Sequence, residues 1–174
     1  MKSIFGFTLV EMAIILALVA IIIIFTVPGL DFLNRAKTLT AATESLYDTL
    51  KLTKSESVKL RSTLNVSFVT GTAWCFGISD SGNPCNCQTA NSCQIGGVER
   101  VISSQNYRGI TLSVSNLTGT TPKYAEFEGI RGTLTNTGSI TLSNTGYATT
   151  MNINKLGLIT ICSDSIRSYN ACTP

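Results

Sequence analysis

An apolar run of 22 residues, from Phe7 to Pro28, constrains this chain more than any other feature of its sequence. At about 1.5 Å per residue the run makes a helix of roughly 33 Å, enough to cross a hydrocarbon core about 30 Å thick. Its single charged residue is Glu11. A carboxylate at mid-membrane costs about 2.5–3.5 kcal/mol, and a position one turn into the run lowers that cost without removing it. Either Glu11 is solvated at the headgroups, or its carboxylate awaits a cationic partner in the membrane.

Three interpretations of the run compete: a cleaved secretory signal, a plain membrane anchor, and a more specific assembly segment. Lys2 supplies the basic start of a signal peptide, but the run is too long and no small-x-small site follows it. A plain anchor leaves Glu11 unexplained. Cleavage between Gly6 and Phe7 would create a positive amine four residues before Glu11. In a staggered bundle of identical helices, that amine can neutralise the Glu11 of a neighbouring chain.

The start of the chain resembles the class III leader of type IV pilins and type II secretion pseudopilins. The resemblance rests on Lys2, on the run Gly6-Phe7-Thr8-Leu9-Val10-Glu11, and on the apolar stretch behind it. Ala20 departs from the pattern, since glycine is frequent there. Pro28 falls where many pilins carry a proline that loosens the helix.

The resemblance implies a prepilin with a leader at 1–6. A membrane-embedded prepilin peptidase is expected to cut between Gly6 and Phe7 and to methylate Phe7. Glu11, the fifth mature residue, then aligns subunits during assembly. The expected location is the bacterial inner membrane, with one span at 7–28 and a periplasmic C-terminal domain, and afterwards the fibre. The expected partners are the membrane, an inner-membrane assembly platform and other pilins or minor pilins.

The rest of the chain predicts an α+β domain of the type IV pilin kind, a long helix on an antiparallel sheet. Leucines at helical spacing indicate an amphipathic continuation of the helix over 29–62. Pro28 and Gly29 predict a kink or local melting between the two parts. From 63 to 174 the period changes to two, which predicts seven or so short strands with one apolar face on the helix and the other face in solvent. The clearest alternations are Leu64-Val66-Phe68, Trp74-Phe76-Ile78, Ile110-Leu112-Val114, Ile140-Leu142 and Met151-Ile153.

Two stretches of this domain resemble the GspH/FimT group of minor pilins and pseudopilins. They are Tyr124–Leu134 with Gly138–Leu142, where an aromatic residue, Arg-Gly and a later Gly precede a strand, and Gly71–Cys75. DNA-binding members of the group carry Gly-Arg-x-Arg in the last strand. The corresponding stretch here, Leu156–Thr160, has no arginine, so nucleic acid is not an expected partner.

Six cysteines in an exported domain predict disulfide bonds. Four lie between Cys75 and Cys93, and two lie near the C-terminus. This segregation favours a Cys162–Cys172 pair, in a loop that resembles the disulfide region of type IV pilins. Cys85 and Cys87 are too close in sequence to pair easily, and the partners of Cys75, Cys85, Cys87 and Cys93 stay open. The rival interpretation is a metal site made from Cys85, Cys87 and Cys93.

Composition argues against catalysis. The chain has no histidine, which excludes Ser-His-Asp triads, Cys-His dyads and His-ligated metals. Its net charge of +3 is too small to indicate a nucleic-acid protein. We therefore expect no enzyme and no cofactor, but a structural minor pilin that primes or caps a type IV pilus. The alternatives are a type II secretion pseudopilin of the protein H kind, a major pilin, and a DNA-uptake pilin.

Overall fold

A computed structural model describes residues 8–172, without the side chains of 24–33. Within these residues the helix α1, Leu9–Leu60, is followed by ten strands. The chain divides into two compact units, Met1–Arg35 and Ala36–Pro174, and α1 runs through both. The strands of the second unit are β1 (Leu64–Val69), β2 (Cys75–Ser79), β3 (Gln94–Ile95), β4 (Val98–Glu99), β5 (Val101–Ser103), β6 (Thr111–Ser115), β7 (Lys123–Phe127), β8 (Gly138–Asn144), β9 (Tyr147–Ile153) and β10 (Ile159–Cys162).

The part of α1 in the second unit is amphipathic, as the leucine spacing predicts. Leu39, Ala42, Leu46 and Leu50 are fully buried at spacings of three and four residues. Several hydroxyl side chains share or border this face, and they bond to carbonyls of the preceding turn. Thr43 Oγ1, for example, donates to Leu39 O at 2.8 Å. Because such bonds satisfy the hydroxyl within its own helix, the face can bury Thr and Ser together with Leu.

The helix is continuous from Leu9 to Leu60, through Pro28 and Gly29. The sequence led us to expect a kink or local melting there, and melting does not occur. A proline removes only one backbone N–H donor, so the other hydrogen bonds of the helix can continue on both sides of it. The helix ends in a Schellman motif, in which Ser62 N donates to Ser57 O and Arg61 N donates to Val58 O. Arg61 has a φ of 51°, a left-handed conformation that glycine usually occupies at this position.

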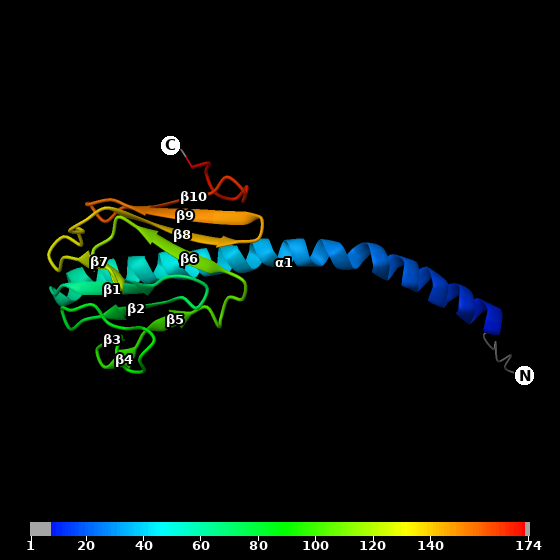
Figure 1. Ribbon diagram of the computed structural model, residues 1–174, viewed down its shortest axis with the longest axis horizontal. Coiled ribbons are helices and arrows are strands. Elements are labelled where there is room, and N and C mark those ends of the chain that lie inside the picture. The colour runs from blue at the N-terminus through cyan, green and yellow to red at the C-terminus, as the bar shows by residue number, and fades with distance from the viewer. Residues whose placement is uncertain (1–7, 173–174) are drawn as a thin grey trace, which may run out of the picture. The chain divides into compact units, whose positions relative to one another are not determined.

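The strands form two four-stranded sheets and a small hairpin, all antiparallel (Figure 1). The first sheet has the order β5-β2-β1-β7, the second has the order β10-β9-β8-β6, and β3 pairs with β4. A bridge between Gly71 and Leu112 connects the two large sheets. The prediction of a helix with an antiparallel β domain is confirmed. The five alternating runs identified in the sequence coincide with or border β1, β2, β6, β8 and β9.

The expectation of one sheet with a wet outer face is wrong for half of the domain. The second sheet follows it: in β8 and β9 the apolar positions are buried and the Ser and Thr positions are mostly half-buried or exposed. In the first sheet, however, β2 is buried on both faces, and so is β1 up to Phe68. The segment 80–100 covers the outer face, and its cysteines form a buried cluster with Cys75 there. Alternation reports which side chains are polar, and a covering loop can still bury them.

The core of the second unit lies between α1 and the inner faces of both sheets. Trp74 is its largest fully buried side chain; it stacks on Phe76 with ring centroids 5.8 Å apart. Its Nε1 donates to Ile110 O at 2.8 Å, so the indole is satisfied while buried. A hydroxyl pair, Thr43 and Thr149 at 2.7 Å, joins α1 to the second sheet inside the core.

Candidate functional site

Glu11 lies in the first turn of α1, directly after a helix cap. Thr8 precedes the helix, and its Oγ1 accepts a hydrogen bond from Glu11 N at 3.3 Å. Thr8 and Glu11 thus occupy the N-cap and N3 positions of a Thr-x-x-Glu capping sequence. A carboxylate in this turn also interacts favourably with the helix dipole. Glu11 is exposed, and among the described residues no Lys or Arg lies within ion-pair distance of it.

The structure describes less of the other N-terminal positions that the sequence singled out. Gly6 and Phe7, the expected cleavage site, lie outside the described residues, and so does the side chain of Pro28. Within residues 8–172, no helix combines the length and the apolar character that crossing a membrane requires.

The six cysteines form three disulfide bonds. Cys162 is bonded to Cys172, the pair favoured by their positions in the sequence. The other bonds are Cys75–Cys87 and Cys85–Cys93, so Cys85 and Cys87 each pair with a more distant residue. The three sulfurs of the rival metal site, those of Cys85, Cys87 and Cys93, are all bonded in disulfides and are therefore not thiolates, the form that binds a metal. The described residues also contain no group of three or more Cys, Asp or Glu arranged to hold a metal.

The Cys162–Cys172 bond closes a loop that is docked on α1. Ile166, a residue of this loop, is buried as part of the hydrophobic core, and the Tyr169 hydroxyl donates to Glu44 Oε1 at 2.6 Å. Burial, followed by the hydrogen bond and the charge of Glu44, raises the pKa of Tyr169 above its usual range. The hydroxyl therefore keeps the proton that it donates to α1 at any physiological pH. Neither Tyr169 nor Glu44 was identified from the sequence, since 125 residues separate them.

Three glycines allow two loops to close against the end of α1, and two of them, Gly129 and Gly132, belong to the GspH/FimT-like stretch. A Cβ on Gly129 would clash with the backbone N of Ser62, and one on Gly132 would come within 2.8 Å of Lys54 Cγ. A Cβ on Gly157 would clash with the carbonyl oxygen of Gly132. The loops 128–134 and 154–158 therefore meet beside α1, and we call them the apex loops.

Lys54 holds one apex loop through its ammonium group. Its Nζ donates to Gly157 O at 2.9 Å and to Leu156 O at 3.2 Å. Asn154 Oδ1 accepts from the backbone N–H groups of Leu156 and Leu158, both at 3.0 Å, so the same loop is also braced from within. Sequence reasoning missed Lys54, because a lysine on a helix is usually a solvated charge. The only available signal was the pair of glycines that leave room for its stem.

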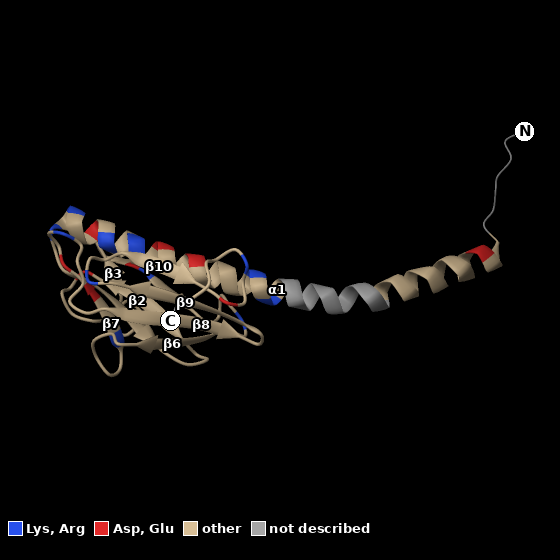
Figure 2. Ribbon diagram, turned by 90° about the horizontal axis from the view of Figure 1, so that it is seen from above, with Lys and Arg blue, Asp and Glu red and all other residues tan. Residues whose placement is uncertain are grey.

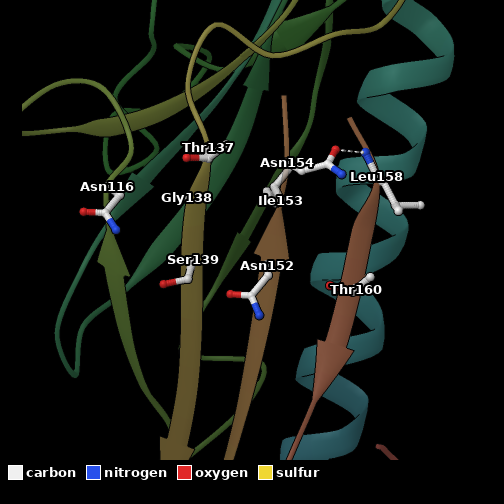
Figure 3. A pocket seen from close by; sticks show the side chains of 9 residues that line it. All are labelled: Asn116, Thr137, Gly138, Ser139, Asn152, Ile153, Asn154, Leu158 and Thr160. Atoms are coloured by element: carbon white, nitrogen blue, oxygen red, sulfur yellow. Dashed lines mark hydrogen bonds between the residues drawn. The ribbon is translucent and has the colours of Figure 1, made fainter. Parts of the chain in front are cut away.

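A polar groove of about 290 Å³ crosses one end of the second sheet. In Figure 3 Ser139, Asn152 and Thr160 stand on the neighbouring strands β8, β9 and β10. No residue that lines the groove is charged, and β8 and β9 contain no Lys, Arg, Asp or Glu (Figure 2). The groove offers hydroxyl and amide hydrogen bonds but no titratable group for acid–base chemistry. Its full lining is Asn116, Thr137, Gly138, Ser139, Asn152, Ile153, Asn154, Leu158 and Thr160.

Comparison with known proteins matches the chain to one family and one fold. Residues 42–157 match the family model described as type II transport protein GspH. No curated protein matches the sequence. Two crystal forms of the type IV minor pilin FimU from Pseudomonas aeruginosa are similar in structure, each at 17% sequence identity. One covers 71% of this chain and 87% of FimU with a TM-score of 0.50; the other covers 70% and 90% with a TM-score of 0.48. At this identity the likeness concerns the fold.

Proposed function

The chain belongs to the GspH family of type II transport proteins, and on that premise we propose that it is a structural subunit of a type IV pilus or related pseudopilus. The observation that carries the proposal is the family match itself. It spans residues 42–157, from the amphipathic part of α1 to the loop before β10, and so covers most of the second unit. The similarity of the fold to the minor pilin FimU supports a minor subunit, one that primes or caps the fibre.

We place the subunit first in the bacterial inner membrane, with the span at 7–28 and the domain at 63–174 in the periplasm. A prepilin peptidase removes residues 1–6 and methylates Phe7. The assembly platform and other pilins are its later partners. In this proposal the chain is a substrate and a building element, and it performs no catalysis of its own.

We assign two functions to Glu11, and an experiment can separate them. As the N3 residue behind the Thr8 cap, it stabilises the start of the helix by at most about 1 kcal/mol. As an unpaired carboxylate in an apolar helix, it attracts the new amine of a neighbouring subunit, and this pairing offsets part of the insertion cost. Cleavage after Gly6 leaves Thr8 in place, so the mature chain keeps the cap and gains the amine.

A pair of Glu11 variants tests the assembly function. Glu11→Gln keeps the size and polarity of the side chain but removes its charge, whereas Thr8→Val removes the cap and keeps the carboxylate. We expect Glu11→Gln to be inserted and cleaved normally but to disappear from sheared fibres, and Thr8→Val to assemble close to the wild-type level. Normal incorporation of Glu11→Gln, measured by immunoblot of the sheared fraction, would refute the role of the carboxylate in assembly.

The second candidate function is a type II secretion pseudopilin, which the description of the matched family favours. A secretion assay separates it from the pilus subunit. Deletion of the gene is expected to abolish export of folded proteins in the pseudopilin case, and to reduce pilus number in the pilus case.

A further inference from the structure

The polar groove at one end of the second sheet contains hydrogen-bonding side chains that the fold itself does not use. Ser139, Asn152 and Thr160 face it from three neighbouring strands, and Asn116 and Thr137 border it. Within residues 8–172, the side chains of these five make no hydrogen bond and no ion pair with another residue. Their donors and acceptors are therefore available together, in one hollow of about 290 Å³.

The register of the sheet places three of these side chains in one row (Figure 3). Asn152 of β9 is paired with Ser139 of β8 on one side and with Thr160 of β10 on the other. Adjacent strands lie about 4.8 Å apart, so the row extends roughly 10 Å across the sheet. Hydroxyl groups and the Asn amide each donate and accept hydrogen bonds. The row thus offers evenly spaced groups of both kinds to a single ligand.

An exposed apolar side chain also lines the groove. Leu158 is 58% exposed there, at the end of the apex loop 154–158. Lys54 Nζ donates to two carbonyl groups of this loop, and Asn154 Oδ1 accepts from Leu158 N at 3.0 Å. Because the loop is already held by these bonds, contact with Leu158 requires little further ordering, which lowers the entropic cost of binding. The groove therefore combines polar groups with one fixed apolar surface.

The same face of the sheet has a second hollow at the other end of its strands. Ser139, Thr141 and Ser143 alternate along β8, so they point to one face. The second hollow, of about 400 Å³, is lined by Ser143, Thr150 and Ser165 among others. Between the two hollows Thr141 and Thr150 lie side by side, with their hydroxyl oxygens 3.2 Å apart. Strands β8 and β9 have seven residues each, which extend roughly 23 Å, and we call this polar surface the β8–β10 track.

The β8–β10 track is almost without charge, and this limits the ligands that fit it. Strands β6, β8, β9 and β10 contain no Lys, Arg, Asp or Glu, and among the described residues Asp164 is the one charged residue that lines either hollow. Its Oδ1 accepts from Cys172 N at 3.0 Å. A nucleic acid requires cations, and an apolar segment leaves the hydroxyls and amides without partners. A neutral ligand rich in hydroxyl groups satisfies them without burying a charge.

We propose that the β8–β10 track binds a neutral polysaccharide. Sugar hydroxyls pair with the row of Ser139, Asn152 and Thr160, and the C–H face of a sugar ring packs on Leu158. The length of the track favours a chain of sugars over a single one, since only a chain reaches both hollows. This binding goes beyond the proposed function, because incorporation of a subunit in a fibre does not require it.

Saturation-transfer difference NMR tests the proposal on the full-length chain, in a detergent whose headgroup is not a sugar. The probes are cellohexaose and maltohexaose, two neutral glucose hexamers with different linkages, and each is compared with glucose. Neutral hydrogen bonds contribute modestly, so we expect saturable transfer to at least one hexamer at millimolar concentration and weaker binding of glucose. No saturable transfer to either hexamer, or an equal affinity for glucose, would overturn the proposal.

Substitutions in the row show whether the hexamer lies on the track. Asn152 and Thr160 are exposed, so alanine there should leave the fold intact. Asn152→Ala and Thr160→Ala are each expected to weaken binding roughly three- to tenfold, since each removes a hydrogen-bonding group. Thr89→Ala is the matched control, at an exposed threonine of the segment that covers the first sheet, and should leave the affinity unchanged. Equal weakening by the control, or no weakening by either row variant, would show that the track is not the site.

The charge of the ligand is tested with a hexamer of galacturonic acid, which has a carboxylate on every sugar. The lining of the track includes no cation and one carboxylate, that of Asp164. We therefore expect this hexamer to bind more weakly than the neutral hexamers. Tighter binding of the acidic hexamer would refute the assignment of a neutral ligand.

Discussion

Removing the Cys162–Cys172 bond should destabilise the domain by an amount that the structure allows us to calculate. The two cysteines are 10 residues apart, and a closed loop of that size contributes roughly 2.7 kcal/mol in the chain-entropy model. Both residues are partly exposed, so serine at these positions adds little burial penalty. The double variant Cys162→Ser/Cys172→Ser should therefore lose about 2.7 kcal/mol of unfolding free energy, which lowers Tm by roughly 5–11 °C. The loop should stay docked through Ile166 and Tyr169.

The Cys85–Cys93 bond gives a matched comparison, because its 8-residue separation predicts a slightly smaller entropic loss of about 2.5 kcal/mol. These two cysteines are 5% and 0% exposed. Serine there buries two hydroxyls without assured partners, at about 1–3 kcal/mol each. Cys85→Ser/Cys93→Ser should thus be the more damaging change, although its loop is shorter. Denaturant unfolding of both variants in detergent, followed by circular dichroism, measures the difference. An equal or larger loss for Cys162→Ser/Cys172→Ser would refute the reasoning.

Two further predictions concern the end of α1. Gly129→Ala should cost about 2–3 kcal/mol, because the added methyl meets the backbone of Ser62, which no side-chain rotation can relieve; a Tm within error of the wild type would contradict this packing. Arg61→Gly should instead stabilise the chain by about 0.5–1 kcal/mol, since φ is 51° at this position and glycine adopts it without strain. The same thermal unfolding experiment measures both changes, and a lower Tm for Arg61→Gly would show that the arginine side chain makes a stabilising contact there.

The sequence predicted the elements in which apolar residues recur at a regular spacing, 3.6 residues in the helix and two in the strands. The leucine spacing identified the buried face of α1 at Leu39, Leu46 and Leu50, but it also included Leu60, which is exposed in the last turn of the helix. Alternation located β1, β2, β6, β8 and β9. Strands of two to four residues, such as β3, β5 and β10, are too short for alternation to be informative.

Residues whose environment depends on distant segments were not predictable. Asn65 and Ser67 alternate with apolar neighbours and so suggested a wet face, yet both are fully buried beneath the disulfide-bonded segment. Ser67 Oγ is satisfied there by Cys85 N at 2.9 Å. The partners of the four clustered cysteines also depend on three-dimensional proximity, because sequence separation alone leaves several pairings open.

In the candidate site, too, features that depend on neighbouring residues were predictable, and features that depend on distant segments were not. The motif around Glu11 can be read in the sequence because its residues are adjacent, and the Thr8 cap shows how they cooperate locally. Lys54 and the apex loops are brought together from positions about 100 residues apart. The GspH/FimT-like stretch includes the loop 128–134, but no local pattern indicates its contact with Lys54 or with the loop 154–158.

The central claim is that the chain is processed at its leader and built into a fibre, and intact mass spectrometry of the protein from sheared fibres tests it most directly. We predict a mass that lacks residues 1–6 and includes one added methyl group, with Phe7 as the first residue of the N-terminal peptide. A chain that still begins at Met1 and carries no methyl group would contradict the claim.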